Sequence, residues 1–300
     1  MLTIIKHKNI YFLISLLVII PGLISLFLYG LRLSIDFTGG TRLTLSFPKN
    51  VTEKEINTIR SVFTEEKIHI ATLQPAKNSV VVRTPPLNEK QNRQLLTKLD
   101  QQLDTFRQEQ FETVGPTIGR ETTLNALKTL VLASLLIVFY IALSFRKVPK
   151  PASSLRFGVC AIIALIHDVL VVIGIFSLLG HFFGVEADSL FVTALLTVIG
   201  FSVHDTIVVF DRIRENLLRT GGSTLAQVVN DSILQTLSRS LNTSLTALLV
   251  LFTLLLFGGE TIRWFVVALL IGIASGTFSS IFNAAPLLVV WHELDQKRKK

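Results

Sequence analysis

The stretch RFGVCAIIALIHDVLVVIGIFSLLG, residues 156–180, decides the fold class of this chain. Apart from Arg156 at its start and the pair His167-Asp168 near its middle, its side chains are almost all apolar or small. A helix needs about 20 such residues to cross about 30 Å of hydrocarbon. Residues 156–180 are therefore predicted to form a membrane-spanning helix.

Stretches of the same kind lie on both sides of it. Together they predict six spans, over residues 9–30, 123–145, 156–180, 189–211, 241–258 and 262–291. The composition agrees, with 50% hydrophobic and 17% charged residues and a mean hydropathy of +0.57. A chain of this composition is too apolar to be a soluble enzyme.

Membrane topology explains the formal net charge of +8 better than nucleic-acid binding does. Basic residues gather at both chain ends and in alternate connections: Lys6, Lys8, Arg146, Lys147, Lys150, Arg156, Arg212, Arg214, Arg219, Arg239, Lys297, Arg298, Lys299 and Lys300. The connection 181–188 contains no Lys or Arg. The positive-inside rule therefore predicts cytoplasmic termini. The segment 212–240, broken at Gly221 and Gly222, is predicted to lie on the membrane surface, where its arginines favour anionic lipids.

The polar region between the first two spans is predicted to be a folded extracytoplasmic domain. Leu43, Leu45 and Phe47 alternate with polar residues, as in a half-buried strand. A capping box at Thr52 and Glu55 opens a helix. Further strands are predicted around 68–70, 80–82 and 110–114, with a second helix that begins at Asn88. The order β-α-β-β-α-β indicates a ferredoxin-like α+β domain.

These elements divide the chain into four parts. We expect a first transmembrane helix over 1–30, the extracytoplasmic domain over 31–122, a five-helix transmembrane region over 123–291, and a basic cytoplasmic tail over 292–300. The single cysteine, Cys160, lies inside a span, so an intramolecular disulfide is impossible and a four-cysteine zinc site is excluded. No cofactor or metal signature is present in the sequence.

Ionisable residues within the spans carry the functional prediction, because each is costly in hydrocarbon unless it is paired or hydrated. Asp168 and Asp205 lie well inside the third and fourth spans. Arg239 opens a polar start of the fifth span, and either snorkels to the interface or reaches Asp205. Asp205 together with Arg239 or a water is the minimum that a proton relay requires, and Asp168 is a further candidate for the relay. The small residues of the sixth span, Gly272, Gly276, Ser279 and Asn283, favour packing within the chain over a partner site.

Four segments carry a family resemblance. They are IDFTGGT at 35–41, VGPTIG at 114–119, TVIGFSVHDTIVVFDRIREN at 197–216 and LSRSLNTSLT at 237–246. With them the chain resembles the SecD/SecF family of bacterial protein-export membrane proteins, within the resistance-nodulation-division superfamily. The resemblance covers nearly the whole length.

The resemblance implies a multi-pass subunit of the bacterial cytoplasmic membrane that works with SecD beside the SecYEG channel. Such a subunit uses the proton motive force to promote translocation of an unfolded exported polypeptide. By motif position, Asp205 matches the key fourth-span aspartate of the family, Arg239 its fifth-span arginine and Asp168 a third-span acidic position. Gly200 belongs to the same fourth-span motif.

The motif around Asp36, Gly39 and Gly40 has a physical role of its own. Paired glycines permit backbone angles closed to other residues, and these two lie where the chain leaves the first span. We interpret the motif as a hinge and packing joint, with an ordinary turn as the alternative.

Three other functions remain open at this point. A small-molecule or lipid exporter of the same superfamily would share the relay. An intramembrane aspartyl protease would use Asp168 and Asp205 as a dyad that shares one proton, although the Gly-x-Gly-Asp setting of such proteases is missing before Asp205. A passive scaffold for the channel would tolerate a neutral residue at position 205.

Overall fold

The computed structural model describes residues 3–300 except 104, 147, 150–151, 220–222 and 299–300. Lys147, Lys150, Gly221, Gly222, Lys299 and Lys300 therefore lie outside the described residues. The chain forms two compact units, a helical unit of residues 1–32 and 128–300 and a second unit of residues 33–127. We call them the membrane bundle and the α/β domain.

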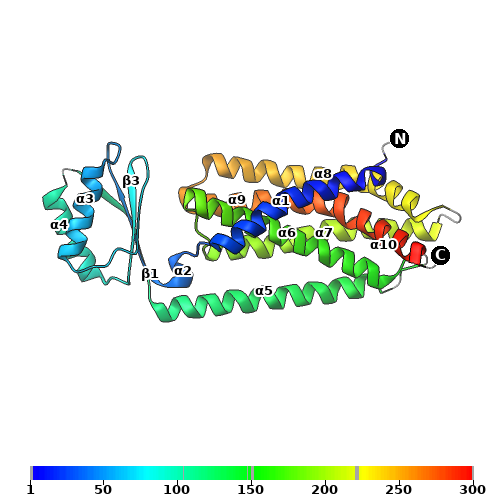
Figure 1. Cartoon of the computed structure of the whole chain (residues 1–300), viewed down its shortest axis with the longest axis horizontal. Helices are drawn as coiled ribbons and strands as arrows, with labels where there is room; N and C mark the ends of the chain where they lie inside the picture. Colours follow the sequence, from blue (N-terminus) through cyan, green and yellow to red (C-terminus); the bar gives the residue numbers. More distant parts are fainter. Residues whose placement is uncertain (1–2, 104, 147, 150–151, 220–222, 299–300) are drawn as a thin grey trace. The chain divides into compact units, whose positions relative to one another are not determined.

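The α/β domain has one antiparallel sheet with two helices on one of its faces (Figure 1). Its elements are α2 (Ile35–Thr38), β1 (Gly40–Ser46), α3 (Glu53–Glu65), β2 (Thr72–Pro75), β3 (Ser79–Thr84), α4 (Glu89–Gln102) and β4 (Arg107–Val114). The strand order β2-β3-β1-β4 is that of the predicted split sandwich. The β-α-β-β-α-β prediction is thus confirmed.

Alternation along the strands places the domain core between the sheet and the helices. Leu43 and Leu45 on β1 face the same side as Val80 and Val82 on β3, and all four side chains are buried. They pack against Phe63 and further buried residues of α3 and α4. Both capping boxes form, at Thr52 and at Asn88, and each satisfies backbone N–H groups that a helix start would otherwise leave unpaired.

The second strand lies later than the sequence predicts. Ile68 and Ile70 do pack partly against the core, but the strand itself runs over Thr72–Pro75, where it pairs with Val80 to Arg83 of β3. The alternation of apolar and polar residues correctly predicted which side chains are partly buried. It did not predict which residues pair with another strand, because pairing depends on the neighbouring strand.

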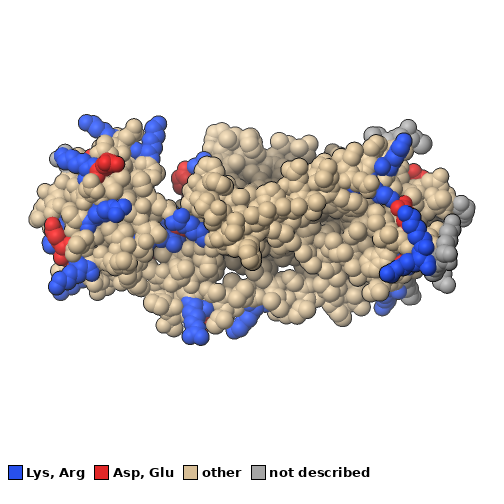
Figure 2. All heavy atoms as spheres, viewed as in Figure 1, with Lys and Arg blue, Asp and Glu red and all other residues tan. Residues whose placement is uncertain are grey.

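Six helical segments are long and apolar enough to cross a membrane. They are α1 (Lys8–Tyr29) with the short helix Ile5–His7 before it, α5 (Pro116–Ser144), α6 (Ser154–Phe183), α7 (Ser189–Arg219), α8 (Leu225–Phe257) and the continuous run of α9 (Glu260–Ser279), a π-helical turn (Ser280–Ala284) and α10 (Ala285–Arg298). The six predicted spans and the mostly helical membrane fold are therefore confirmed. In the face that Figure 2 shows, the central part of the bundle carries no Lys, Arg, Asp or Glu.

The inner helices pack through aromatic and small residues. Phe145, directly after α5, meets Phe157 of α6 and Phe210 of α7 edge to face, with ring centroids 4.9–5.7 Å apart. The small residues of the sixth segment pack within the chain, as predicted. A Cβ at Gly272 would collide with Val198, and one at Gly276 would crowd Ser202.

The structure differs from the predicted membrane-surface segment over 212–240. Helix α7 continues to Arg219 and α8 begins at Leu225, and the two helices pack together with Ile213 and Ile233 buried. Asn216 Nδ2 donates to Ser232 Oγ at 2.8 Å across this pair. The apolar residues of this segment pack between the two helices. Their periodicity is the same as that of a helix lying at the membrane interface, so periodicity alone does not distinguish the two arrangements.

Helices α1 and α6 approach most closely at two glycines, Gly22 and Gly174. A Cβ built on Gly22 lies only 2.8 Å from the Gly174 Cα, so there is no room for a methyl group. One turn further on, Ser25 and Ser177 share a hydrogen bond of 2.9 Å. Small residues let membrane helices approach until their backbones touch.

We expect Gly22→Ala to destabilise the bundle by about 1–3 kcal/mol, the usual cost of overpacking. The matched control is Gly200→Ala on α7, where an added Cβ meets nothing within 4 Å in the chain and the change should be neutral or stabilising by up to about 1 kcal/mol. Unfolding by SDS in mixed micelles, followed through Trp264 and Trp291, compares the two variants. Equal stabilities would contradict the close approach.

Candidate functional site

Asp205 lies inside the bundle on α7 and is 2% exposed. Its carboxyl group is close to the hydroxyl groups of Ser240 and Ser244 on α8 and of Thr277 on α9. Ser244 and Thr277 share a hydrogen bond of 2.5 Å with each other. Among the described residues, neither Asp205 Oδ2 nor Ser240 Oγ has a hydrogen-bond partner. A buried oxygen without a partner is costly, and here it leaves one side of the carboxyl group open to a proton or a water.

Asp168 on α6 has the opposite environment, because its carboxyl group is saturated with donors. It is fully buried, and its Oδ2 accepts from Ser202 Oγ at 2.5 Å and from Ser279 Oγ at 2.7 Å. Its Oδ1 accepts from Ser275 Oγ at 2.8 Å and lies 2.9 Å from His167 Nδ1. The four groups come from three helices, so Asp168 ties α6 to α7 and α9.

The same network extends to the first and last helical segments. Asn283 Nδ2, in the π-helical turn, donates to Ser15 Oγ on α1 at 2.7 Å and lies 3.2 Å from His167 Nε2. On the other side, Ser280 Oγ and Thr206 Oγ1 are 2.8 Å apart. A π-helical turn inside an α-helix often marks a functional position, and this one turns Ser280 and Asn283 into the polar interior.

The two membrane carboxylates do not form a dyad. Within the described residues, no hydrogen bond joins Asp168 to Asp205, and the hydrogen-bonding capacity of Asp168 is taken up by the four groups around it. A protease dyad needs two carboxyl groups that share one proton. The geometry therefore does not favour the protease alternative.

The structure does not bring Arg239 to Asp205. Arg239 is exposed on α8, on the outer side of the helix from Ser240, and no ion pair or hydrogen bond links its side chain to Asp205 in the part of the chain that the structure describes. The pairing of the two residues remains a prediction.

Two polar stripes lie on the outside of the bundle at the level of the apolar spans. One runs along α8, through Arg239, Asn242 and Thr246. The other runs along α7, through Thr193, Thr197, Gly200 and His204. Their spacing of three and four residues places the members of each stripe on one helix face. The threonine hydroxyl groups donate to carbonyls of their own helices, but Arg239, Asn242 and His204 are costly against lipid, so the two stripes mark a surface suited to cover by another protein.

The glycine motif forms a tight packing joint inside the α/β domain. Gly39 and Gly40 have φ values of +70° and +117°, which residues other than glycine rarely adopt. A Cβ on Gly119, in the first turn of α5, would lie 2.8 Å from the Gly39 nitrogen. Asp36 N–H donates to Ser34 Oγ at 3.1 Å at the start of α2. The motif thus anchors β1 against the start of α5.

Sequence reasoning missed most of the hydroxyl groups in the site. Ser275, Thr277 and Ser240 were given no role, although each faces a buried carboxyl group. A signal was present: Ser275 and Ser279 are four residues apart, as are Ser240 and Ser244, and such pairs share a helix face. Among the described residues, no group of three or more His, Cys, Asp or Glu side chains is placed to hold a metal ion.

The fold and the site define a class of protein, the multi-pass membrane proteins with one split α/β domain after the first span and carboxyl groups kept inside the bundle. Residues 94–294 match the model of the family described as protein export membrane protein SecD/SecF, C-terminal, and residues 24–51 match that of the SecD/SecF GG motif. The chain belongs to the SecD/SecF family.

Individual relatives agree over nearly the whole chain. The protein translocase subunit SecF of Thermobaculum terrenum is 50% identical over 98% of this chain and 95% of its own length. The SecF subunit of Anaerolinea thermophila is 42% identical over 97% of this chain and 94% of its own. The crystal structure of SecDF from Thermus thermophilus superposes with a TM-score of 0.83 at 36% identity, over 97% of this chain and 38% of that longer chain.

Proposed function

We propose that this chain is an accessory subunit of the Sec protein-export machinery that, together with SecD, uses the proton motive force to promote polypeptide translocation. Relatives that share its whole length are named protein translocase subunits, and a longer relative is named SecDF. These names describe a transport subunit rather than an enzyme, and they do not favour a small-molecule or lipid exporter.

One observation supports proton coupling above the others: the buried Asp205 carboxyl group with its open Oδ2. It lies where α7, α8 and α9 meet, so its charge state bears on how three helices pack. A charge at this depth is costly, and protonation removes it. One elementary charge that crosses the membrane contributes about 2.3 kcal/mol per 100 mV, enough to bias two arrangements of these helices roughly fiftyfold.

The polar stripes on α7 and α8 support a SecD-binding surface on this face of the bundle. Arg239 and Asn242 are exposed at membrane level in the isolated chain, and a membrane partner with acidic or amide groups would satisfy them. In this arrangement Arg239 lies at the subunit boundary, one residue from Ser240, which lines the Asp205 site. The SecYEG channel, the exported polypeptide and membrane lipids are the remaining proposed partners.

The orientation follows from the basic end of the bundle. Lys8 pairs with Glu293 at 2.6 Å, Arg156 pairs with Asp295, and Arg214 pairs with Asp211 at 2.6 Å. Figure 1 shows both chain termini at this end. We place this end in the cytoplasm by the positive-inside rule, in the bacterial cytoplasmic membrane. The α/β domain then belongs to the opposite compartment.

The test is export-coupled proton flux in membrane vesicles that contain the Sec channel, SecD and this chain. We expect flux that requires an exported polypeptide and that falls to background in Arg239→Met, which keeps length and apolar surface but removes the charge. Arg263→Met is the matched control, because Arg263 is half exposed and paired with Glu260 at the start of α9. Full flux in Arg239→Met would contradict the role given to this residue.

A further inference from the structure

The outer face of helix α10 carries a hollow that the proton relay does not use. Its volume is about 550 Å³. The described residues that line it all belong to this one helix: Leu287, Val290, Trp291, Leu294, Asp295, Lys297 and Arg298. They recur at spacings of three and four residues, so their side chains share one helix face. The hollow is therefore a groove along the surface of α10, and we call it the α10 groove.

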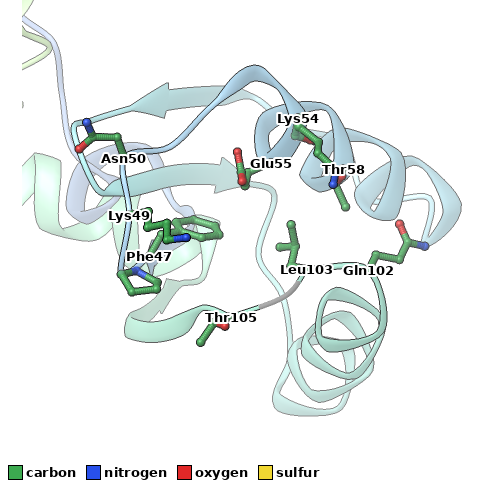
Figure 3. Close-up of a pocket in the computed structure, with 10 residues that line it drawn as sticks. Phe47, Lys49, Asn50, Lys54, Glu55, Thr58, Gln102, Leu103 and Thr105 are labelled. Atoms are coloured by element: carbon green, nitrogen blue, oxygen red, sulfur yellow. The ribbon is translucent and has the colours of Figure 1, made fainter.

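A hollow in the α/β domain has a different lining. It measures about 170 Å³ and lies between the loop after β1, the start of α3 and the end of α4. Figure 3 shows charged and amide side chains around it, among them Lys49, Asn50, Lys54 and Gln102. Such groups suit water. The α10 groove exposes mainly apolar surface instead, and that surface suits a hydrocarbon chain.

We propose that the α10 groove binds one anionic phospholipid of the surrounding membrane, with an acyl chain along its apolar part and the phosphate group at Lys297 and Arg298. The inference goes beyond the proposed function, because the site needs neither an exported polypeptide nor a partner subunit. It rests on the order of the residues along the helix and on the charge at the end of the groove.

The groove has the length of one membrane leaflet. From Leu287 to Lys297 the helix rises by about 15 Å, at about 1.5 Å per residue, and half of the hydrocarbon core is also about 15 Å thick. The apolar part ends at Leu294, and Lys297 and Arg298 follow within the next turn. When an acyl chain lies along the apolar part, its phosphate group therefore reaches the level of the two basic side chains.

The two basic residues at the end of the groove are available to a ligand. Lys297 and Arg298 are exposed, and neither side chain has an ion pair or hydrogen bond within the part of the chain that the structure describes. Asp295, the one acidic residue of the described lining, already pairs with Arg156. Two neighbouring cations repel each other, and a phosphate group between them would form charge-assisted hydrogen bonds with both.

The apolar part of the groove is held in place by the bundle. Leu287 and Trp291 pack partly against the buried core of the helices, whereas Leu294 is 57% exposed. An acyl chain that lies against the first two meets side chains that are already ordered, so little rotamer freedom is lost on binding. The exposed Leu294 side chain loses its remaining contact with the surroundings when the chain covers it.

The position of the groove agrees with an anionic headgroup. It lies at the end of the bundle that holds both chain termini (Figure 1), and the orientation proposed above places this end in the cytoplasmic leaflet. Each Lys or Arg close to a surface of anionic lipids strengthens binding about fivefold. Two such residues predict a preference of about thirtyfold for an anionic over a zwitterionic headgroup.

Native mass spectrometry of the full chain, released from mixed micelles, tests the proposal by counting the lipids that stay bound. The micelles contain phosphatidylglycerol and phosphatidylcholine in equal amounts and with the same acyl chains, so only the headgroups differ. We expect the parent to retain one phosphatidylglycerol, about thirtyfold over phosphatidylcholine. Lys297→Gln together with Arg298→Gln should bring this ratio close to one.

Lys6→Gln together with Arg219→Gln is the matched control for charge. It removes two positive charges from exposed residues outside the groove, and it should retain lipid like the parent. Val290→Trp tests the apolar part, because its indole fills the groove and leaves both basic residues in place. We expect it to weaken retention about tenfold, whereas Leu135→Trp, at an exposed position of α5, should not.

Equal retention of the two lipids by the parent would overturn the inference, and so would an equal loss in the Lys6 and Arg219 control. A Val290→Trp chain that keeps its lipid would also overturn it, because a phosphate would then bind at the surface without an acyl groove. A parent that carries no lipid and appears as a dimer would assign the groove to a second copy of the chain instead. Proton flux is measured separately, so failure here leaves the proposed function standing.

Discussion

Asp205→Asn is expected to abolish proton flux through the complex, down to the level of vesicles that lack this chain. Asparagine has nearly the same size as aspartate and its amide can hydrogen-bond to the nearby hydroxyl groups of Ser240, Ser244 and Thr277, so the three helices should keep their packing. It has no proton to gain or lose. The variant therefore separates titration from packing at a position that is 2% exposed.

Flux is measured as dissipation of an imposed pH gradient during export of a model preprotein, and the export yield is measured with and without a protonophore. The yield of the Asp205→Asn complex should equal that of the parent with the protonophore present. Asp211→Asn serves as the control, since Asp211 is on the same helix, 57% exposed and paired with Arg214. If Asp205→Asn retains full flux and full stimulation of export, the proton relay has been assigned to the wrong group.

Asp168→Ala is expected to have the largest effect on stability, about 3 kcal/mol or more. The substitution removes the acceptor of three serine hydroxyl groups and the partner of the His167 ring. A buried donor left without a partner costs about 1–3 kcal/mol, and the alanine leaves a space as well. Asp168→Asn should cost less, because hydroxyl groups can rotate to accept from an amide.

Unfolding by SDS in mixed micelles orders these variants, and Asp231→Ala, at an exposed position of α8, should behave like the parent. The expected order of stability is parent, Asp168→Asn, then Asp168→Ala. A stable Asp168→Ala chain would mean that the four groups around Asp168 find other partners. In that case the network would not hold α6, α7 and α9 together.

For Asp168 and Asp205, residue type predicted a functional role but did not distinguish the environments of the two side chains. Both residues follow a histidine in an apolar span, and by cost in hydrocarbon both are predicted to be functional. Tertiary contacts separate them. Asp168 is enclosed by Ser202, Ser275 and Ser279, whereas Asp205 keeps an oxygen without a partner. Donors that come from helices more than 30 residues away leave no mark beside the carboxylate in the sequence.

The sequence by itself determined the membrane class, the six spans, the β-α-β-β-α-β domain and the capping box at Thr52. Each rests on a local rule: the length of an apolar run, a period of two or of about four residues, or a residue that caps its own helix. Only the tertiary structure decided that the second strand is Thr72–Pro75, that 212–240 contains the packed ends of α7 and α8, and that Arg239 faces outward from Asp205. Each of these outcomes depends on which distant segment of the chain packs against the residues in question. The free energy of such a contact depends on both segments, so the sequence of one segment alone does not predict it.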